Sequence, residues 1–191
     1  MSTPDIPILR RGAVASTNDL LKELLREGRR EPLFLAAEEQ TAGRGQFARS
    51  WLSHQGKGLY LSYLFFPERE KVEGLTKAAA VILSRFLKGY GADVSIKIPN
   101  DLMAGGRKIA GILTESVFRG EDCLGVVIGI GLNLFYERRE LEEAGIPGTS
   151  LCLETDQPFS YEEILLGLTE ALKQLNTITA EEISLEYPAD A

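Results

Sequence analysis

The sequence predicts an α+β domain with one mixed, mainly antiparallel β-sheet packed against helices. Strand-like segments dominate the middle of the chain, and amphipathic helical segments flank them. A Gly105-Gly106 pair between two apolar runs predicts a β-hairpin. The 191 residues contain no repeat and no low-complexity linker, which favours one domain with a sizeable core.

The first half of the chain gives two helix signals and two strand signals. Leucines at helical spacing follow Ser16 and stop before Gly28, which predicts a helix with a glycine just beyond its last turn. Segments 33–39 and 58–67 have the composition of strands. Segment 74–91 has an apolar stripe at helical spacing and predicts a long helix.

The second half continues the same alternation. Segment 93–99 predicts a short strand, 101–118 the hairpin, and 123–135 a strand interrupted by glycines. A charged helix is expected over 137–144. Segment 160–175 opens with a capping box and carries an apolar stripe, which predicts a second long helix.

Composition excludes several classes of function. The net charge is −7 and the isoelectric point is near 4.9, so no basic face for nucleic acid is expected. No apolar run approaches the roughly 18 residues that a membrane span needs, and no signal peptide is recognisable. We therefore expect a cytoplasmic protein with no nucleic-acid or membrane partner. Any anion site must be a local cluster of cations in an acidic protein.

The cysteines and the single histidine argue against a metal site. Cys123 and Cys152 lie far apart among apolar residues, so we expect small buried side chains rather than a disulfide or a metal pair. His54 is the only histidine, which excludes a histidine-rich metal site and makes a Ser-His-Asp triad a poor fit. No metal site formed by the protein alone is predicted.

Segment 40–51, QTAGRGQFARSW, contains a G-x-G-x-x-A pattern. A dinucleotide-binding loop must be followed by a helix whose N-terminus meets the pyrophosphate. The segment that follows has the composition of a strand instead, so a dinucleotide-binding loop is rejected. The Walker pattern of phosphate-binding loops is also absent. The glycines let a ligand approach the backbone, Arg44 and Arg49 offer bidentate donors, and Trp51 can stack on a planar ring.

Taken alone, this loop is as well explained by a surface turn with solvated arginines and a buried tryptophan. Three further segments also have ordinary explanations: STND (16–19) as a helix cap, KIPND (97–101) as a turn, and GGRKIAGIL (105–113) as a hairpin. Together the four segments supply hydroxyls, amides, cations and one carboxylate, all near the ends of elements where sites tend to form.

The order and the residues of these segments resemble those of the catalytic domain of biotin protein ligases. The family pattern is Ser-Thr-Asn, G-R-G-R-x-G-R-x-W, K-W-P-N-D, R-K-[LI]-A-G-I-L and a glycine-rich strand ending near Gly-x-Asn. The chain has STN (16–18), GRGQFARSW (43–51), KIPND (97–101), RKIAGIL (107–113) and GIGLN (129–133). The resemblance covers residues 13–134 and implies the class II aminoacyl-tRNA synthetase-like fold of that family.

The resemblance implies a reaction in two steps. Biotin's carboxylate attacks the α-phosphorus of ATP, which gives biotinyl-5′-AMP and pyrophosphate. A lysine of a biotin carboxyl carrier protein or domain then attacks the mixed anhydride. ATP with Mg²⁺ on its phosphates and biotin are therefore the expected ligands, and the first step needs fixed cations more than a nucleophile.

The resemblance also assigns residues to the two ligands. Lys108 is expected between the biotin carboxylate and the α-phosphate as the main catalytic cation, with Arg44 beside it. The biotin side comprises Ser16, Thr17, Asn18, Gln40, Gly43, Arg44, Gly45, Gln46, Lys108, Gly111 and Gly129. The ATP side comprises Gln46, Arg49, Trp51, Lys97, Asn100, Asp101, Lys108 and Asn133. Asp101 is expected either to contact Mg²⁺ or to pair with a nearby cation.

The chain departs from the family pattern at three positions. Ile98 stands where the family has Trp, Gln46 where it has Arg, and Ala48 where it has Gly. Residues 1–176 are expected to form the catalytic domain and 177–191 a short tail, with neither an N-terminal helix-turn-helix nor a C-terminal β-barrel. A repressor role is therefore not expected.

Two other readings stay open beside an active biotin ligase. One is a remnant that binds biotin or its adenylate without turnover, which the loop changes and the short tail favour. The other is a lipoate or octanoate ligase of the same superfamily, although those enzymes lack the tryptophan-terminated arginine loop. The sequence identifies no particular acceptor and leaves homodimer formation open.

Overall fold

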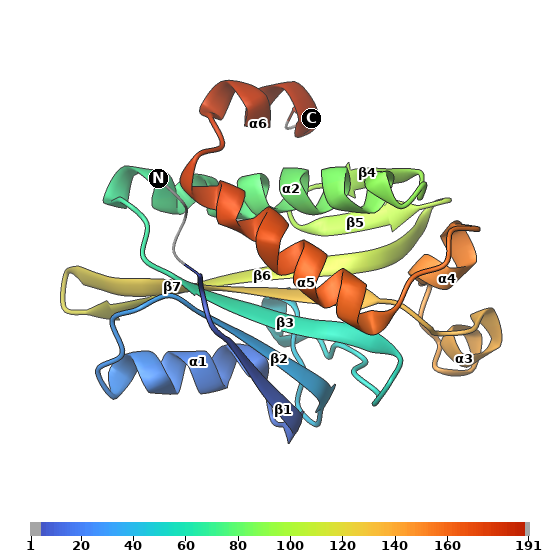
Figure 1. Cartoon of the computed structure of the whole chain (residues 1–191), viewed down its shortest axis with the longest axis horizontal. Helices are drawn as coiled ribbons and strands as arrows, with labels where there is room; N and C mark the ends of the chain where they lie inside the picture. The colour runs from blue at the N-terminus through green and yellow to red at the C-terminus, as the bar shows by residue number, and fades with distance from the viewer. Residues whose placement is uncertain (1–4, 190–191) are drawn as a thin grey trace.

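The structure, a computed structural model, describes residues 5–189 and is built on one seven-stranded sheet (Figure 1). The strand order is β1-β2-β3-β7-β6-β5-β4. The strands are β1 (Ile8–Val14), β2 (Leu33–Gln40), β3 (Gly58–Phe65), β4 (Val94–Lys97), β5 (Asp101–Ala104), β6 (Arg107–Arg119) and β7 (Asp122–Asn133). Only β1 and β2 pair in parallel, so the predicted mixed, mainly antiparallel sheet is confirmed.

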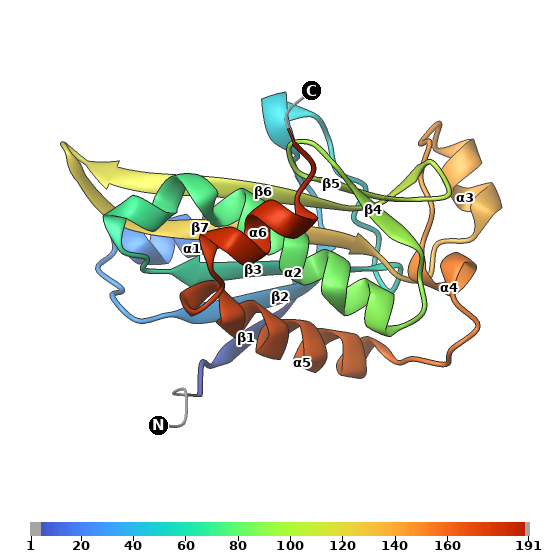
Figure 2. The same ribbon diagram turned by 90° about the horizontal axis from the view of Figure 1, so that it is seen from above.

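Helices cover the two faces of the sheet unequally (Figures 1 and 2). Helices α2 and α5 pack together on one face, whereas α1 contacts β2, β3 and β7 on the other. The helices are α1 (Thr17–Arg26), α2 (Leu75–Gly89), α3 (Arg138–Glu143), α4 (Leu151–Glu154), α5 (Tyr161–Leu172) and α6 (Ala180–Glu186). Three 3-10 helices span Gln46–Ala48, Arg69–Gly74 and Lys173–Asn176.

Strand β7 shows why one face of the sheet is left open for a site. Successive side chains of a strand point to opposite faces. Ile128, Ile130 and Leu132 enter the large core under α2 and α5, and Val127 enters a smaller core under α1. Past Val127, the α1 face of β7 carries Gly129 and Gly131 before Asn133 at the end of the strand, so the backbone at the two glycines is bare.

Local signals in the sequence correctly placed several boundaries. Ser16 caps α1 by accepting a hydrogen bond from the backbone N–H of Asp19 at 3.4 Å. Gly28, just past the end of α1, has a φ of +112°. Gly105 and Gly106 have φ of +52° and +74°, the left-handed pair that a two-residue hairpin turn requires. The predicted capping box at the start of α5 is also present.

Other parts of the fold were missed or wrongly predicted. No strand was expected at β1, which lies at the sheet edge and is mostly exposed, so it lacks an apolar pattern. The region after Asn176 contributes α6, where Glu186 pairs with Arg85 of α2 at 2.6 Å, and Tyr187 donates a hydrogen bond to the carbonyl of Pro99. Residues 190–191 of the expected tail lie outside the described part of the chain.

The two cysteines are unpaired, as expected, but the prediction that they are buried is wrong. Cys123 follows the turn at the free end of the β6–β7 hairpin, and Cys152 lies on the surface of α4. Apolar neighbours in sequence were misleading, because Leu151 is buried and Leu124 is partly buried while the cysteine beside each of them faces outward. Ile98, which replaces the family tryptophan, is partly buried against the large core. Among residues 5–189, no helix is both long enough and apolar enough to span a bilayer.

Candidate active site

Two adjoining cavities open on the α1 face, between the first turn of α1, the loop joining β2 to β3, and the bare part of β6 and β7. The first cavity is narrow, about 40 Å³, and the second is about 300 Å³. The first is lined by Ser16, Thr17, Asn18, Gln40, Arg44, Gly45, Trp51, Asn100, Lys108, Gly111, Ile112, Leu113, Gly129, Ile130 and Gly131. The second is lined by Gly45, Gln46, Arg49, Ser50, Trp51, Leu52, Asn100, Asp101, Lys108, Asn133, Leu141, Ile146 and Pro147.

The floor of the first cavity exists because glycines leave the sheet backbone uncovered. Gly111 of β6 and Gly131 of β7 are direct cross-strand partners, and the ring of Trp51 lies over both. A methyl group on Gly131 would come within 2.4 Å of the indole, and one on Gly111 within 3.1 Å. At Gly129 a methyl group would lie 2.3 Å from Oδ1 of Asn18. Gly129 and Gly131 therefore require glycine for close approach rather than for backbone flexibility, whereas a methyl group on Gly111 would need the Lys108 side chain and the indole to shift slightly.

Buried polar groups at the first turn of α1 form the opposite wall. Gln40 accepts hydrogen bonds through Oε1 from the backbone N–H and the hydroxyl of Thr17, at 2.9 and 3.0 Å. Its Nε2 donates to the hydroxyl of Ser53 at 3.1 Å. The Ser62 hydroxyl lies 2.6 Å from Oδ1 of Asn18 and 2.7 Å from the hydroxyl of Thr17. Because these partners fix one another, the wall presents its polar atoms in set directions.

Arg44 is held in place by a carboxylate of α1. Its Nη2 donates to Oδ1 of Asp19 at 2.7 Å, and its Nη1 donates to Oδ2 of the same residue. These hydrogen bonds keep the pKa of Asp19 far below its usual range and raise the pKa of Arg44. Both shifts favour the charged forms, so the pair is ionised near neutral pH.

Lys108 lies where the two cavities meet. Its ammonium is 2.6 Å from Oδ1 of Asp101 and 4.9 Å from the centre of the Trp51 ring. A cation at this distance over an indole face is attracted by the ring quadrupole. Among residues 5–189, the indole Nε1 of Trp51 is a buried donor without a hydrogen-bond partner. The junction of the cavities thus combines a cation with an unsatisfied donor.

The loop that carries Arg44 is tightly folded. Gly45 donates a backbone hydrogen bond to the carbonyl of Arg49 at 2.7 Å, and the backbone N–H of Trp51 donates to the carbonyl of Gly43 at 2.9 Å. At its tip Phe47 has a φ of +56° and its side chain is 85% exposed. A non-glycine residue in this left-handed region stores about 1–2 kcal/mol of strain. Such strain is typical of loops that bind ligands.

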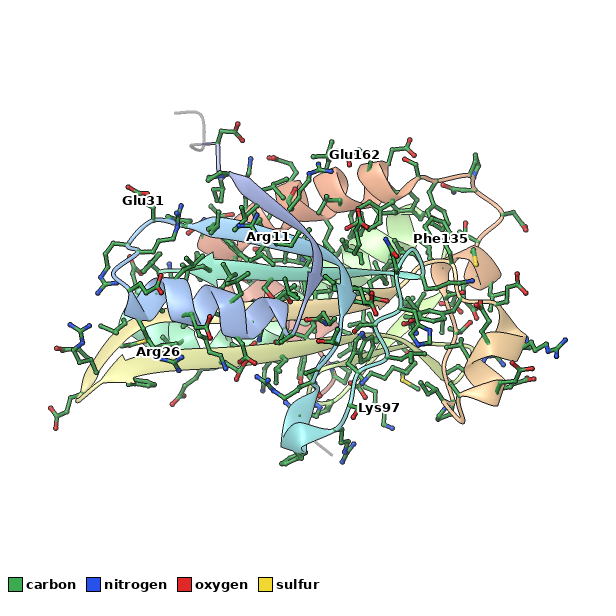
Figure 3. All side chains as sticks on the ribbon, turned by 90° about the horizontal axis from the view of Figure 1, so that it is seen from below. Arg11, Arg26, Glu31, Lys97, Phe135 and Glu162 are labelled. Atoms are coloured by element: carbon green, nitrogen blue, oxygen red, sulfur yellow. The ribbon has the colours of Figure 1, made fainter. Side chains whose placement is uncertain are left out.

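Most of the residues assigned from the sequence are brought together. On the biotin side only Gly43 and Gln46 do not line the first cavity: Gly43 packs against Ser53 and the Trp51 backbone, and Gln46 lines the second cavity. On the ATP side only Lys97 (labelled in Figure 3) lies outside the second cavity, on an exposed position of β4. The side chain of Ala48 lies outside the described part of the structure.

Several lining and supporting residues were missed. Asp19 and Glu115 contact Arg44 or Asn18, and Ser62 supports the wall at α1. Asp19 directly follows the STN segment, so its sequence position was a usable signal. Glu115 and Ser62 lie on strands with no local pattern that marks them. Leu141, Ile146 and Pro147 form an apolar edge of the second cavity.

A family model described as the biotin/lipoate A/B protein ligase family matches residues 12–133. The chain belongs to this family. It is 36% identical over 146 residues to the bifunctional ligase/repressor BirA of Escherichia coli K12, covering 70% of this chain and 45% of BirA. It is 34% identical over 146 residues to the biotin–acetyl-CoA-carboxylase ligase of Paracoccus denitrificans, covering 69% of this chain and 58% of that enzyme. The chain spans less than half the length of BirA.

Solved structures of biotin protein ligases share the fold, which confirms the predicted fold family. The Leishmania major ligase, in complex with biotinyl-5-AMP, superposes with a TM-score of 0.79 at 21% identity, covering 97% of this chain and 81% of that chain. The Aquifex aeolicus ligase, in complex with biotin and ATP, superposes with a TM-score of 0.67 at 29% identity, covering 89% and 72%.

Replacing Gly131 by alanine tests the bare floor of the site. The added methyl group would overlap the indole, so we expect Trp51 to be displaced and both cavities to lose their shared wall. Trp51 is the only tryptophan, so its fluorescence maximum should shift. Gly12→Ala is the matched control, because a methyl group there meets nothing within 4 Å. An unchanged spectrum for Gly131→Ala would contradict the assigned packing.

Proposed function

We propose that the chain activates biotin with ATP to biotinyl-5′-AMP and transfers the biotinyl group to a lysine of a biotin carboxyl carrier domain. The observation that carries this proposal is the pair of adjoining cavities with Lys108 at their junction. Gly45, Trp51, Asn100 and Lys108 line both cavities. A reaction that joins two bound molecules needs such a shared wall, with a cation at the point where the reacting atoms meet.

The first cavity suits biotin. Its wall at α1 offers hydroxyl and amide groups for the polar ureido ring, whereas the Leu113 side chain and the Trp51 ring offer apolar contact for the rest of the molecule. Its present volume is smaller than a bicyclic ligand. We therefore expect the glycine-flanked loop around Arg44 to move when biotin enters, as lid loops do in other enzymes.

The second cavity suits Mg·ATP. Attack of a biotin carboxylate oxygen on the α-phosphorus forms one P–O bond and breaks the bond to the β-phosphate oxygen, which releases pyrophosphate. Mg²⁺ enters with ATP as part of the substrate and neutralises the phosphates. Asp101 and the side-chain amides of Asn100 and Asn133 provide oxygen atoms of the type that Mg²⁺ prefers. In the second step a lysine amine attacks the biotinyl carbonyl and AMP leaves.

Both asparagines have a second task in the protein. Nδ2 of Asn100 donates to the carbonyl of Ile112 at 2.6 Å, and Nδ2 of Asn133 donates to the carbonyl of Thr149 at 2.9 Å. These hydrogen bonds fix the orientation of each side-chain amide. The Oδ1 atom of each amide therefore points away from the carbonyl that its Nδ2 contacts. We infer that the two residues orient the nucleotide, because their own side chains are held rigidly by these hydrogen bonds.

A pyrophosphate-release assay tests the proposal. Release that depends on biotin and Mg·ATP supports the ligase, and biotin incorporation into a carrier domain tests transfer. Release that depends on lipoate or octanoate would favour the other branch of the family. Binding of biotin without any release would favour a remnant that does not turn over. Gln46 in place of the family arginine is the feature that keeps this second candidate open.

Removing the Lys108 ammonium should slow adenylate formation. The cation lies at the junction of the cavities, where negative charge develops during attack, so Lys108→Ala should lower the rate by about 10² or more. Thermal stability should change little. Lys88→Ala is the control, because it removes the same charge from the exposed end of α2. Near-normal pyrophosphate release by Lys108→Ala would remove Lys108 from the mechanism.

Changing the shape of the Arg44 cation should weaken biotin binding although the charge stays. Lysine cannot offer the paired, planar donors of a guanidinium, so Arg44→Lys should raise the Kd for biotin measured by calorimetry. Arg10→Lys alters a similar bidentate pair, to Glu162 on the exposed surface, and should leave the Kd unchanged. Equal affinities for all three proteins would show that the loop is only a surface turn.

Gln46 should make the site release its intermediate early. A neutral amide contact is weaker than a charge-assisted one by about 1–2 kcal/mol, which corresponds to roughly 5- to 30-fold faster escape of the acyl-adenylate. Gln46→Arg should therefore lengthen the lifetime of bound adenylate and reduce biotin labelling of an unrelated lysine-rich protein. Gln174→Arg adds the same charge at an exposed position in another region. No bystander labelling by the wild type while adenylate forms would refute this prediction.

A further inference from the structure

Four charged side chains from three elements meet beside the first cavity. Asp19 and Lys22 come from α1, Arg44 from the loop between β2 and β3, and Glu115 from β6. Lys22 lies 3.0 Å from Asp19, and Nη2 of Arg44 lies 3.9 Å from Oε1 of Glu115. Lys22 and Glu115 also pair directly. The cluster contains two cations and two anions, so its net charge is zero.

We propose that Asp19 is a positioning residue, which holds the Arg44 guanidinium at the edge of the first cavity in the orientation that receives the ligand's anionic group. The inference rests on the proposed function, because that function supplies the anion. Asp19 does not line either cavity, whereas Arg44 lines the first. Asp19 therefore acts on the ligand only through Arg44.

Arg44 needs such a partner because little else fixes it. It stands between two glycines, and its side chain is 34% exposed. An arginine has several rotatable bonds, and ordering it only when the ligand arrives would subtract that entropy from the binding free energy. Asp19 orders the side chain beforehand. Its two oxygens use two of the five guanidinium N–H groups, so donors remain for a ligand.

Asp19 is itself well fixed. It lies at the third position of α1, where the helix dipole favours a carboxylate, and its backbone N–H is bonded to the cap residue Ser16. Lys22, one turn along the same helix, offsets the negative charge that Asp19 would otherwise set against an incoming anion. The carboxylate can thus position the arginine without strongly repelling the ligand.

The test compares biotin binding by calorimetry for the wild type and Asp19→Asn. Asparagine has nearly the same shape but no charge, so the bidentate contact weakens and the Kd should rise roughly 5- to 30-fold. Asp19→Glu keeps the charge and should restore part of the affinity. Glu162→Gln is the matched control: it removes the carboxylate from the Arg10 pair on α5, far from the cyan loop that carries Arg44 (Figure 3). Its Kd should equal that of the wild type.

A double-mutant cycle separates positioning from a merely structural role. If Asp19 acts through Arg44, then Asp19→Asn should change the Kd little once Arg44→Lys is present. The same fold loss in both backgrounds would overturn the inference, because Asp19 would then act elsewhere. Unchanged or tighter binding by Asp19→Asn would also overturn it and would make the carboxylate a competitor of the ligand. A wild type that binds no biotin would refute the proposed function itself, and the positioning role with it.

Discussion

The contact between the Trp51 ring and the bare backbone of Gly111 and Gly131 is the constraint on which the rest of the site depends. It brings the loop from β2 to β3 down onto the sheet, and the same loop carries Arg44. The indole then supports the ammonium of Lys108 and forms a wall of both cavities. Because the two glycines face each other across β6 and β7, a side chain at Gly131 would overlap the ring and one at Gly111 would push against it.

Charge balance explains how an acidic protein can hold two cations beside its cavities. The two cations assigned to the reacting groups are each paired with an aspartate from another element: Arg44 with Asp19 and Lys108 with Asp101. An unpaired cation in a partly buried site would be expensive. The pairs orient each partly exposed cation and offset its charge. Under the proposed function, the anions of a ligand would share or replace a carboxylate rather than order a free side chain.

The sequence predicted the parts of the fold that depend on local chemistry. The cap at Ser16, the left-handed Gly28 and the turn at Gly105-Gly106 are all short-range signals, and the structure has each of them. The ordered motifs also predicted most residues that line the cavities, because their glycines let the Trp51 ring and the Asn18 side chain pack directly on the sheet. The cavities themselves depend on how those motifs meet across the sheet.

What the sequence could not predict depends on contacts between distant segments. Glu115 contacts Lys22 and Asn18, which lie 93 and 97 residues earlier in the sequence, and nothing in its own strand marks it as different from its neighbours. Strand β1 is defined by its pairing with β2 rather than by an apolar pattern. The predicted burial of Cys123 and Cys152 was wrong for the opposite reason. Their neighbours in sequence are apolar, but the cysteines themselves face outward.

Strand β7 divides stability and function between its two faces. Ile128, Ile130 and Leu132 bury their side chains in the large core, where removing a large apolar group typically costs about 2–5 kcal/mol. The alternate positions, Gly129 and Gly131, contribute nothing to that core and shape the site instead. A strand has a period of two, so one residue of slippage would exchange the faces and place isoleucine side chains where Asn18 and Trp51 now lie. Burial of the isoleucines therefore fixes the register, and the register in turn keeps the site open.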